Sequence, residues 1–238
     1  MSTFAVSGSF AREQLRAPLT LELLVAIPAF FVLIFASVLG QFAAALGGTL
    51  EVRSATSISA GWAAAFLSGT LAFFQVASSR GADRRLAAAG LGAGRVALSR
   101  IAASLVLAGT VSAVAFVTLW LRSGIGHPLH AAAAILAFAA IYIGIGAVVG
   151  AFVTAPLEGS LLVMLVFALD AFSGPQMTRG GGVGAFTPTH QAASLLIAAG
   201  AGHHSPNADW IGAGGVALAA LAVAQAAFWL AARTRRTA

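Results

Sequence analysis

Apolar stretches of membrane-crossing length dominate this chain of 238 residues, in which 59% of the residues are hydrophobic and 8% are charged. A spanning helix needs about 20 mostly apolar residues, and a typical soluble domain has about 25% charged residues. The stretches lie at residues 21–39, 58–77, 101–121, 131–152, 160–172 and 211–232, of which the fifth is short. The sequence therefore predicts an all-α integral membrane protein, a single transmembrane domain over residues 1–238 with six transmembrane helices.

The arginines indicate which side of the membrane each connection faces, because basic residues gather on the cytoplasmic side. With both termini in the cytosol, ten arginines lie inside and three lie outside, namely Arg53, Arg122 and Arg179. The tryptophans, which favour membrane interfaces, also fall at predicted span ends. Trp62, Trp120 and Trp210 fall at outer ends, and Trp229 falls at an inner end. We therefore expect a multi-pass membrane protein with its N-terminus and C-terminus in the cytosol.

The first 20 residues are more polar than the spans, and they mix apolar residues with Arg12, Glu13 and Arg16. Arginines on such a segment can contact anionic lipid headgroups. The pattern predicts an interfacial helix on the inner surface over residues 1–20. The alternative is a short disordered tail.

A basic island, "SSRGADRRLAAAGLGAGRVALSR" (residues 78–100), follows the second span and carries five arginines. Residues 82–89 are good helix formers and Gly90 can end a helix, so we expect a short cytosolic helix between two spans. Asp83 would lie near its start, where the helix dipole favours a carboxylate. Arg84, Arg85 and Leu86 are candidates for contact with a cytosolic partner. The alternative is a connection that only sets the topology.

The fifth span contains a carboxylate, Asp170, at about 15 Å along a helix that rises about 1.5 Å per residue. Gly174 and Pro175 then end the apolar run. A carboxylate near mid-membrane marks a cavity or a partner. Asp170 would bond a neighbouring helix or freed backbone, or act in gating or substrate passage, or face lipid by chance.

The longest outer connection, residues 173–209, contains "TPTHQAASLLIAAG", whose apolar part is too short to span. Thr187 can cap a helix, Pro188 suits its first position, and Gly200 can end it. We expect a re-entrant or interfacial helix at the outer mouth.

The missing residue types exclude several kinds of chemistry. The chain has no Cys, which excludes disulfides and thiolate metal sites, and no Lys, which excludes a classical P-loop. We expect no metal site, because the adjacent His203 and His204 with Asp209 rarely share one ion well. The net charge of +6 is assigned to membrane topology and not to a nucleic-acid partner. Gly146 and Gly150 form a small-xxx-small pair on the fourth span, which is weak evidence of close helix contact.

Together these features resemble the ABC-2 class of permease, the membrane subunit of an ABC exporter. The resemblance rests on "LRAPLTLELLVAIPAFFVLIFA" at the start, on the basic island, and on "APLEGSLLVMLVFALDAFSGPQM" around the fifth span. That family has a surface helix, six spans, a cytosolic coupling helix after the second span and a re-entrant hairpin before the sixth. The stretch between Gly174 and Trp210 has one convincing apolar helix, so only a partial re-entrant outer segment is implied.

The resemblance implies roles for particular residues around two places. Residues at the joint with a nucleotide-binding subunit would be Arg84, Arg85, Leu86, Arg12, Arg16 and Glu158. Residues in gating or in the substrate path would be Asp170 and Pro175.

The function implied is that of a transport subunit and not of an enzyme. The chain would move an amphipathic, drug-like or lipid-like substrate, while ATP and Mg would bind a separate cytosolic ABC ATPase. A second permease copy or a paralogue would complete a dimer in the lipid membrane.

Three alternatives stay open. A channel or secondary transporter would need more intramembrane charge than Asp170 and Glu22, or inverted repeats. A six-span intramembrane serine protease could use Ser68 and His190, although no histidine lies in the last span. A regulatory membrane scaffold is the third.

Overall fold

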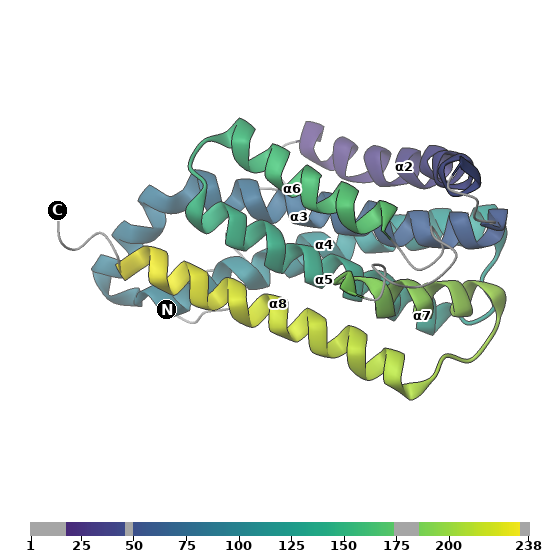
Figure 1. Ribbon diagram of the computed structural model, residues 1–238. Helices are drawn as coiled ribbons and strands as arrows, with labels where there is room; N and C mark the ends of the chain where they lie inside the picture. The colour runs from purple at the N-terminus through teal and green to yellow at the C-terminus, as the bar shows by residue number, and fades with distance from the viewer. Residues whose placement is uncertain (1–17, 46–49, 174–185, 234–238) are drawn as a thin grey trace.

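A computed structural model describes residues 18–45, 50–173 and 186–233 of the chain, and every element in these ranges is helical (Figure 1). The long helices are α2 (Pro18–Ala45), α3 (Val52–Leu86), α4 (Ala93–Ser123), α5 (Pro128–Phe152) and α8 (Asn207–Arg233). Two shorter helices, α6 (Pro156–Phe172) and α7 (His190–Ala201), lie between α5 and α8. A single π-helical turn, η1 (Ala87–Leu91), joins α3 to α4. Most of the predicted interfacial helix over residues 1–20 lies outside the described residues.

Five of these helices are long and apolar enough to cross a membrane, which makes the chain an all-α, multi-pass membrane protein. They coincide with five of the six predicted spans. The other predicted span corresponds to α6, which has 17 residues. That length covers about 26 Å, less than the roughly 30 Å hydrocarbon core of a bilayer. A six-span count therefore does not follow from the described helices alone.

The bundle is built around α3 and α5, which are the most deeply buried of the long helices. In Figure 1, α2 and α6 lie along one side of this pair and α8 lies along the other. Glycines allow the two central backbones to approach each other. Gly146 of α5 faces Gly69 of α3, and Gly150 faces the carbonyl of Phe73 one turn on. The glycine pair that was weak evidence in the sequence therefore lies where the backbones of α3 and α5 are in close contact.

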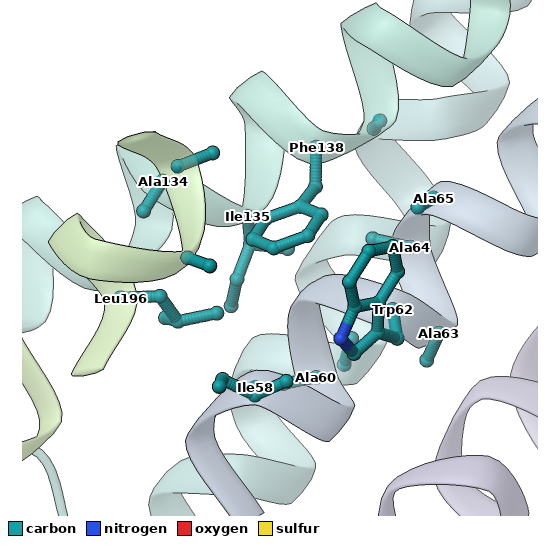
Figure 2. Packing of buried hydrophobic residues seen from close by; sticks show 14 of the residues in the cluster. Ile58, Ala60, Trp62, Ala63, Ala64, Ala65, Ala134, Ile135, Phe138 and Leu196 are labelled. Carbon is teal, nitrogen blue, oxygen red and sulfur yellow. The ribbon is translucent and has the colours of Figure 1, made fainter. Parts of the chain in front are cut away.

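Trp62 is the centre of the apolar core, and its predicted place at an outer interface is wrong (Figure 2). Its side chain is 1% exposed. The indole ring meets Phe138 of α5 and Phe167 of α6 edge-on, with ring centroids 5.1 and 5.5 Å away. The reason is that α3 begins at Val52 instead of residue 58, so Trp62 lies nearly three turns inside the helix. Trp120 and Trp229 are exposed near the ends of α4 and α8.

The basic island does not form a separate short helix between two spans. Instead, α3 continues without interruption to Leu86, and the chain turns at Gly90 and Gly92, whose φ angles are 101° and 75°. Residues before Gly90 are good helix formers, so nothing ends α3 at the predicted membrane boundary. The predicted role of Gly90 in ending the helix is confirmed, because a positive φ favours glycine. Asp83 consequently lies in the final turns of α3, and its expected position near a helix start is wrong.

The short outer helix also differs from its predicted boundaries. Thr187 and Pro188 precede α7, which begins at His190, and the helix ends at Gly202 in the left-handed conformation. Gly200 has a different role from the predicted helix end, because a Cβ there would collide with the Ser57 hydroxyl of α3. Close packing on α3 therefore explains this glycine.

Candidate functional site

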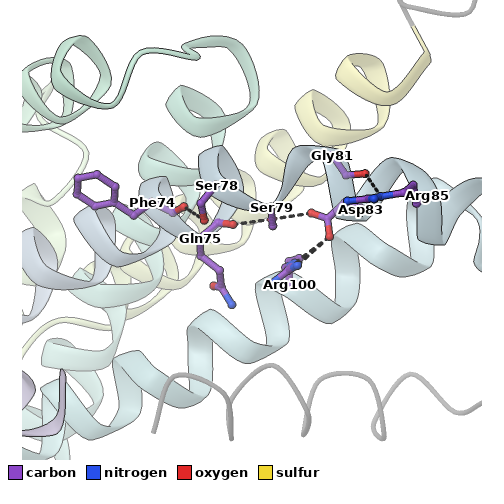
Figure 3. A network of polar contacts seen from close by, with 8 residues as sticks. All are labelled: Phe74, Gln75, Ser78, Ser79, Gly81, Asp83, Arg85 and Arg100. Atoms are coloured by element: carbon purple, nitrogen blue, oxygen red, sulfur yellow. Dashed lines mark hydrogen bonds and ion pairs between the residues drawn. The ribbon is translucent and has the colours of Figure 1, made fainter. Parts of the chain in front are cut away.

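Polar side chains of α3 and α4 meet near the turn between these helices (Figure 3). Asp83 Oδ1 accepts hydrogen bonds from Arg100 Nη2 at 2.9 Å and from Arg100 Nε at 3.1 Å. The other carboxylate oxygen accepts one from Ser79 Oγ at 2.8 Å. Asp83 and Arg100 are 4% and 8% exposed, so the ion pair is buried. We refer to Ser79, Asp83 and Arg100 as the α3–α4 joint.

A second arginine of the island fastens α3 to α5. Arg80 donates from Nε to the carbonyl of Gly150 at 3.0 Å and from Nη2 to the carbonyl of Val153 at 2.6 Å. These carbonyls belong to the last turn of α5 and the residue after it, where no further helical N–H is available to bond them. A basic side chain at a helix C-terminus is also favoured by the helix dipole. The island is thereby tied to the connection that leads into α6.

The predicted coupling residues lie at this end of the bundle where the structure describes them. Arg85 is exposed and its Nε donates to the carbonyl of Gly81 at 3.3 Å. Leu86 ends α3 and is half-buried, and Glu158 is exposed in the first turn of α6. Arg84 belongs to α3. Figure 1 shows the α3–α4 turn, the α5–α6 connection and the end of α8 at one end of the bundle. Arg12 and Arg16 lie outside the described residues.

The island arginines divide into two classes that the sequence did not separate. Arg80 and Arg100 bond groups inside the bundle, whereas Arg85 and Arg95 are exposed. The sequence contains one signal for this division. Asp83 is the single acidic residue among five arginines in residues 78–100, and a lone carboxylate in such a segment is a natural partner for one of them.

Asp170 forms a second buried polar cluster, which links α6 to α5 and to the residues before α7. Its carboxylate accepts hydrogen bonds from the Tyr142 hydroxyl at 2.9 Å and from the Thr189 hydroxyl at 3.0 Å. The Thr187 side chain and the Thr189 backbone N–H also bond to it. Asp170 is 3% exposed. The expectation that it bonds a neighbouring helix is confirmed, and the lipid-facing alternative is wrong.

The surroundings of this cluster are aromatic. The Tyr142 ring meets those of Trp62 and Phe167 edge-on, at centroid distances of 6.3 and 6.2 Å. In such surroundings an unpaired carboxylate is costly, and the hydroxyl donors offset that cost. The Thr189 hydroxyl bonds Asp170 and makes no cap hydrogen bond to α7. Pro175, which was also placed in the gating region, lies outside the described residues.

Histidines gather at the opposite end of the bundle from the α3–α4 turn. The rings of His127 and His204 are tilted by 35° with their centroids 4.7 Å apart, and His130 meets Trp210 edge-on at 5.2 Å. His127 Nε2 lies 3.1 Å from the carbonyl of Gly202. Among the described residues, no group of three metal-ligating side chains is arranged to hold a metal ion.

The residues considered for a serine protease are not paired. Ser68 Oγ and His190 Nδ1 are buried atoms with no hydrogen-bond partner in the described parts of the chain. A serine nucleophile needs an adjacent base within hydrogen-bond reach. The arrangement therefore offers no support for acyl-transfer chemistry at Ser68.

Comparison with known proteins gives no assignment: no protein-family model matches the sequence, and no curated protein is detectably similar to it.

Proposed function

We propose that this chain is the transmembrane permease subunit of an ATP-driven ABC exporter. It would move an amphipathic, drug-like or lipid-like substrate across the cytoplasmic membrane of a prokaryote, with both of its termini in the cytosol. The observation that carries this proposal is the α3–α4 joint. Beside it Arg85 and Arg95 are exposed at the end of the bundle, while Arg100 and the neighbouring Arg80 make the bonds that join α3 to α4 and α5.

A subunit driven from outside must transmit a force from its surface into its spans. The unbroken helix α3 supplies a stiff element, since it carries Arg85 in its last turns and runs from there through the core. The ion pair between Asp83 and Arg100 couples α4 to α3, and Arg80 couples the end of α5 to α3. A displacement of the α3–α4 turn would therefore move α3, α4 and α5 together.

The cytosolic partner would be an ABC ATPase that binds ATP and Mg, because the chain has no Lys and hence no classical P-loop lysine. Arg85, Arg95 and Glu158 are exposed near the proposed docking surface. Arg84, Leu86, Arg12 and Arg16 would contribute to the same contact. A second permease copy or a paralogue would complete the transport pathway.

The apolar surface of the bundle supports the proposed substrate class. The exposed faces of the long helices carry large apolar side chains such as Phe30, Leu121 and Leu218. A substrate that travels beside or between such helices needs apolar parts of its own. A small free ion would find few charged groups to replace its hydration shell.

The test compares charge reversal at the two ends of the bundle. Arg85→Glu places a negative charge on the proposed docking surface, and Arg122→Glu makes the same change on an exposed arginine in the last turn of α4, at the other end. The tagged chain is expressed with its neighbouring genes, and the retained ATPase and its stimulated hydrolysis are measured. We expect Arg85→Glu to lower both and Arg122→Glu to leave both unchanged. Equal effects, or no P-loop subunit retained by the parent chain, would overturn the proposal.

The buried carboxylate favours a second candidate, an ion-coupled secondary transporter. Asp170 lies inside the bundle with hydroxyl partners, as expected of a proton-binding group in a transporter. Transport by the purified chain in vesicles, without ATP but with a pH gradient, would support this candidate. Its loss in Asp170→Asn would assign the coupling to that residue.

A further inference from the structure

A line of buried polar side chains follows the contact between α3 and α4, extending inward from the α3–α4 joint. On α3 the spacing is seven, four and four residues, which places the side chains along one face of the helix. All of them are buried or half-buried. We name this set the α3–α4 seam; it comprises Ser68, Gln75, Ser79 and Asp83 of α3, Arg100 and Ser104 of α4, which bond to them, and the buried Ser112 about two turns beyond Ser104 on α4.

Two cross-links set the register of the seam. At the end nearest the α3–α4 turn Arg100 bonds Asp83. Two turns away along α3 and about one turn away along α4, Ser104 Oγ donates to Gln75 Oε1. Because the helices are antiparallel, positions that increase along α4 pair with positions that decrease along α3. Ser68 and Ser112 each lie about two turns beyond the second cross-link. Figure 3 shows the part of the seam nearest the α3–α4 turn, with Gln75, Ser79 and Asp83 in order along α3 and Arg100 of α4 bonded to Asp83.

The far part of the seam contains polar atoms without protein partners. Within the described residues, Ser68 Oγ, Ser112 Oγ and Gln75 Nε2 are buried and make no hydrogen bond. Hydroxyls elsewhere in these helices bond the carbonyl four residues earlier, as Ser59 does with Ala55 and Thr118 does with Val114. Ser68 and Ser112 do not use this local option. Buried polar groups almost always have a partner, either protein or water.

The geometry points to a water-binding line: we propose that ordered water occupies the α3–α4 seam and bonds Ser68, Gln75 and Ser112. A buried water needs two to four polar partners. The seam supplies three unsatisfied groups in addition to the hydroxyl of Ser104. Water reaches this line from the end of the bundle that carries the α3–α4 turn, past the Asp83–Arg100 pair.

The line reaches deep into the bundle. Ser68 lies about 22 Å from Asp83 along the axis of α3. Its chain neighbour Gly69 packs against Tyr142, the donor to Asp170, on the α5 side of the helix. The seam therefore ends at the depth of the second buried polar cluster, with α3 between them. Water in the seam would bond Ser68, Gln75 and Ser112 inside the membrane whether or not an ATPase drives the chain. This inference therefore does not rest on the proposed function.

The experiment uses single cysteines, since the chain has no Cys of its own. Ser68→Cys and Ser112→Cys place a thiol in the seam at small change in volume. Ala139→Cys is the dry control, because Ala139 is 1% exposed in the apolar core of α5, one turn from Tyr142. Ser78→Cys, at an exposed position near the α3–α4 turn, identifies the side from which the reagent enters. A small membrane-impermeant methanethiosulfonate is added to sealed vesicles of either orientation.

Only a hydrated thiol forms the reactive thiolate readily, and a thiol in apolar surroundings is inert. We expect Ser68→Cys and Ser112→Cys to react at least about tenfold faster than Ala139→Cys. They should react only in the vesicle orientation that labels Ser78→Cys. Rates equal to that of Ala139→Cys for both seam variants would overturn the inference. Labelling from the opposite side alone would overturn the proposed route of the water. Equal elution of all four proteins in gel filtration controls for folding.

Discussion

The close backbone contact between α3 and α5 offers a sharp test of the packing. A Cβ added to Gly146 of α5 would lie 2.8 Å from the carbonyl carbon of Gly69 and within contact distance of its oxygen. The obstacle is the backbone of α3, which cannot rotate away as a side chain can. Gly146→Ala must therefore push α3 and α5 apart, and these are the two central helices of the bundle.

The expected magnitude combines two opposing terms. Overpacking a core costs about 1–3 kcal/mol, and a backbone obstacle favours the upper part of this range. Alanine gains about 1 kcal/mol over glycine in a helix interior. The net destabilisation of Gly146→Ala is then about 2 kcal/mol, which lowers the Tm by about 4–8 °C in a chain of this size.

A matched control is available on α4. Gly109 also lies within a long helix, and a Cβ there would meet nothing within 4 Å. Gly109→Ala should therefore gain from helix propensity alone, by at most about 1 kcal/mol. The assay is the Tm in detergent, read as the fraction of monodisperse protein left after heating. A Gly146→Ala variant that is as stable as Gly109→Ala would refute the reasoning that the α3–α5 crossing requires glycine.

Two further predictions concern the buried polar groups. Arg100→Met leaves the Asp83 carboxylate buried without its cation and should lower the free energy of unfolding by about 3–5 kcal/mol. The double variant Arg100→Met with Asp83→Leu removes both charges, and its stability should be within about 1 kcal/mol of the parent. A double variant as unstable as the single one in the same Tm assay would contradict this. Asp170→Leu removes the acceptor of Tyr142 and Thr189 and should cost about 1–3 kcal/mol for each stranded hydroxyl. Asp170→Asn keeps an acceptor, so its loss of stability should be less than half that of Asp170→Leu. Equal losses of stability in the two variants would show that hydrogen bonding at Asp170 does not matter.

The sequence was a good guide to whatever depends on one segment at a time. Five of the predicted spans coincide with helices of spanning length, because membrane insertion depends on hydrophobicity added over about 20 consecutive residues. Gly90 was identified as a helix end for a similar reason, since glycine tolerates a positive φ. The prediction that Asp170 has a partner also came from its segment alone, because a lone carboxylate in an apolar run needs one.

The tertiary structure decided which residues face one another. Trp62 could have faced an interface or the core, and its place depends on where α3 begins and on which side α5 and α6 pack. The partner of Asp83 lies on α4, and those of Asp170 lie on α5 and before α7. Such pairs depend on the rotation and register of two helices, which their separate compositions do not encode. The sequence by itself determined that this chain enters a membrane as helices, and only the packing of those helices determined where its buried charges found partners.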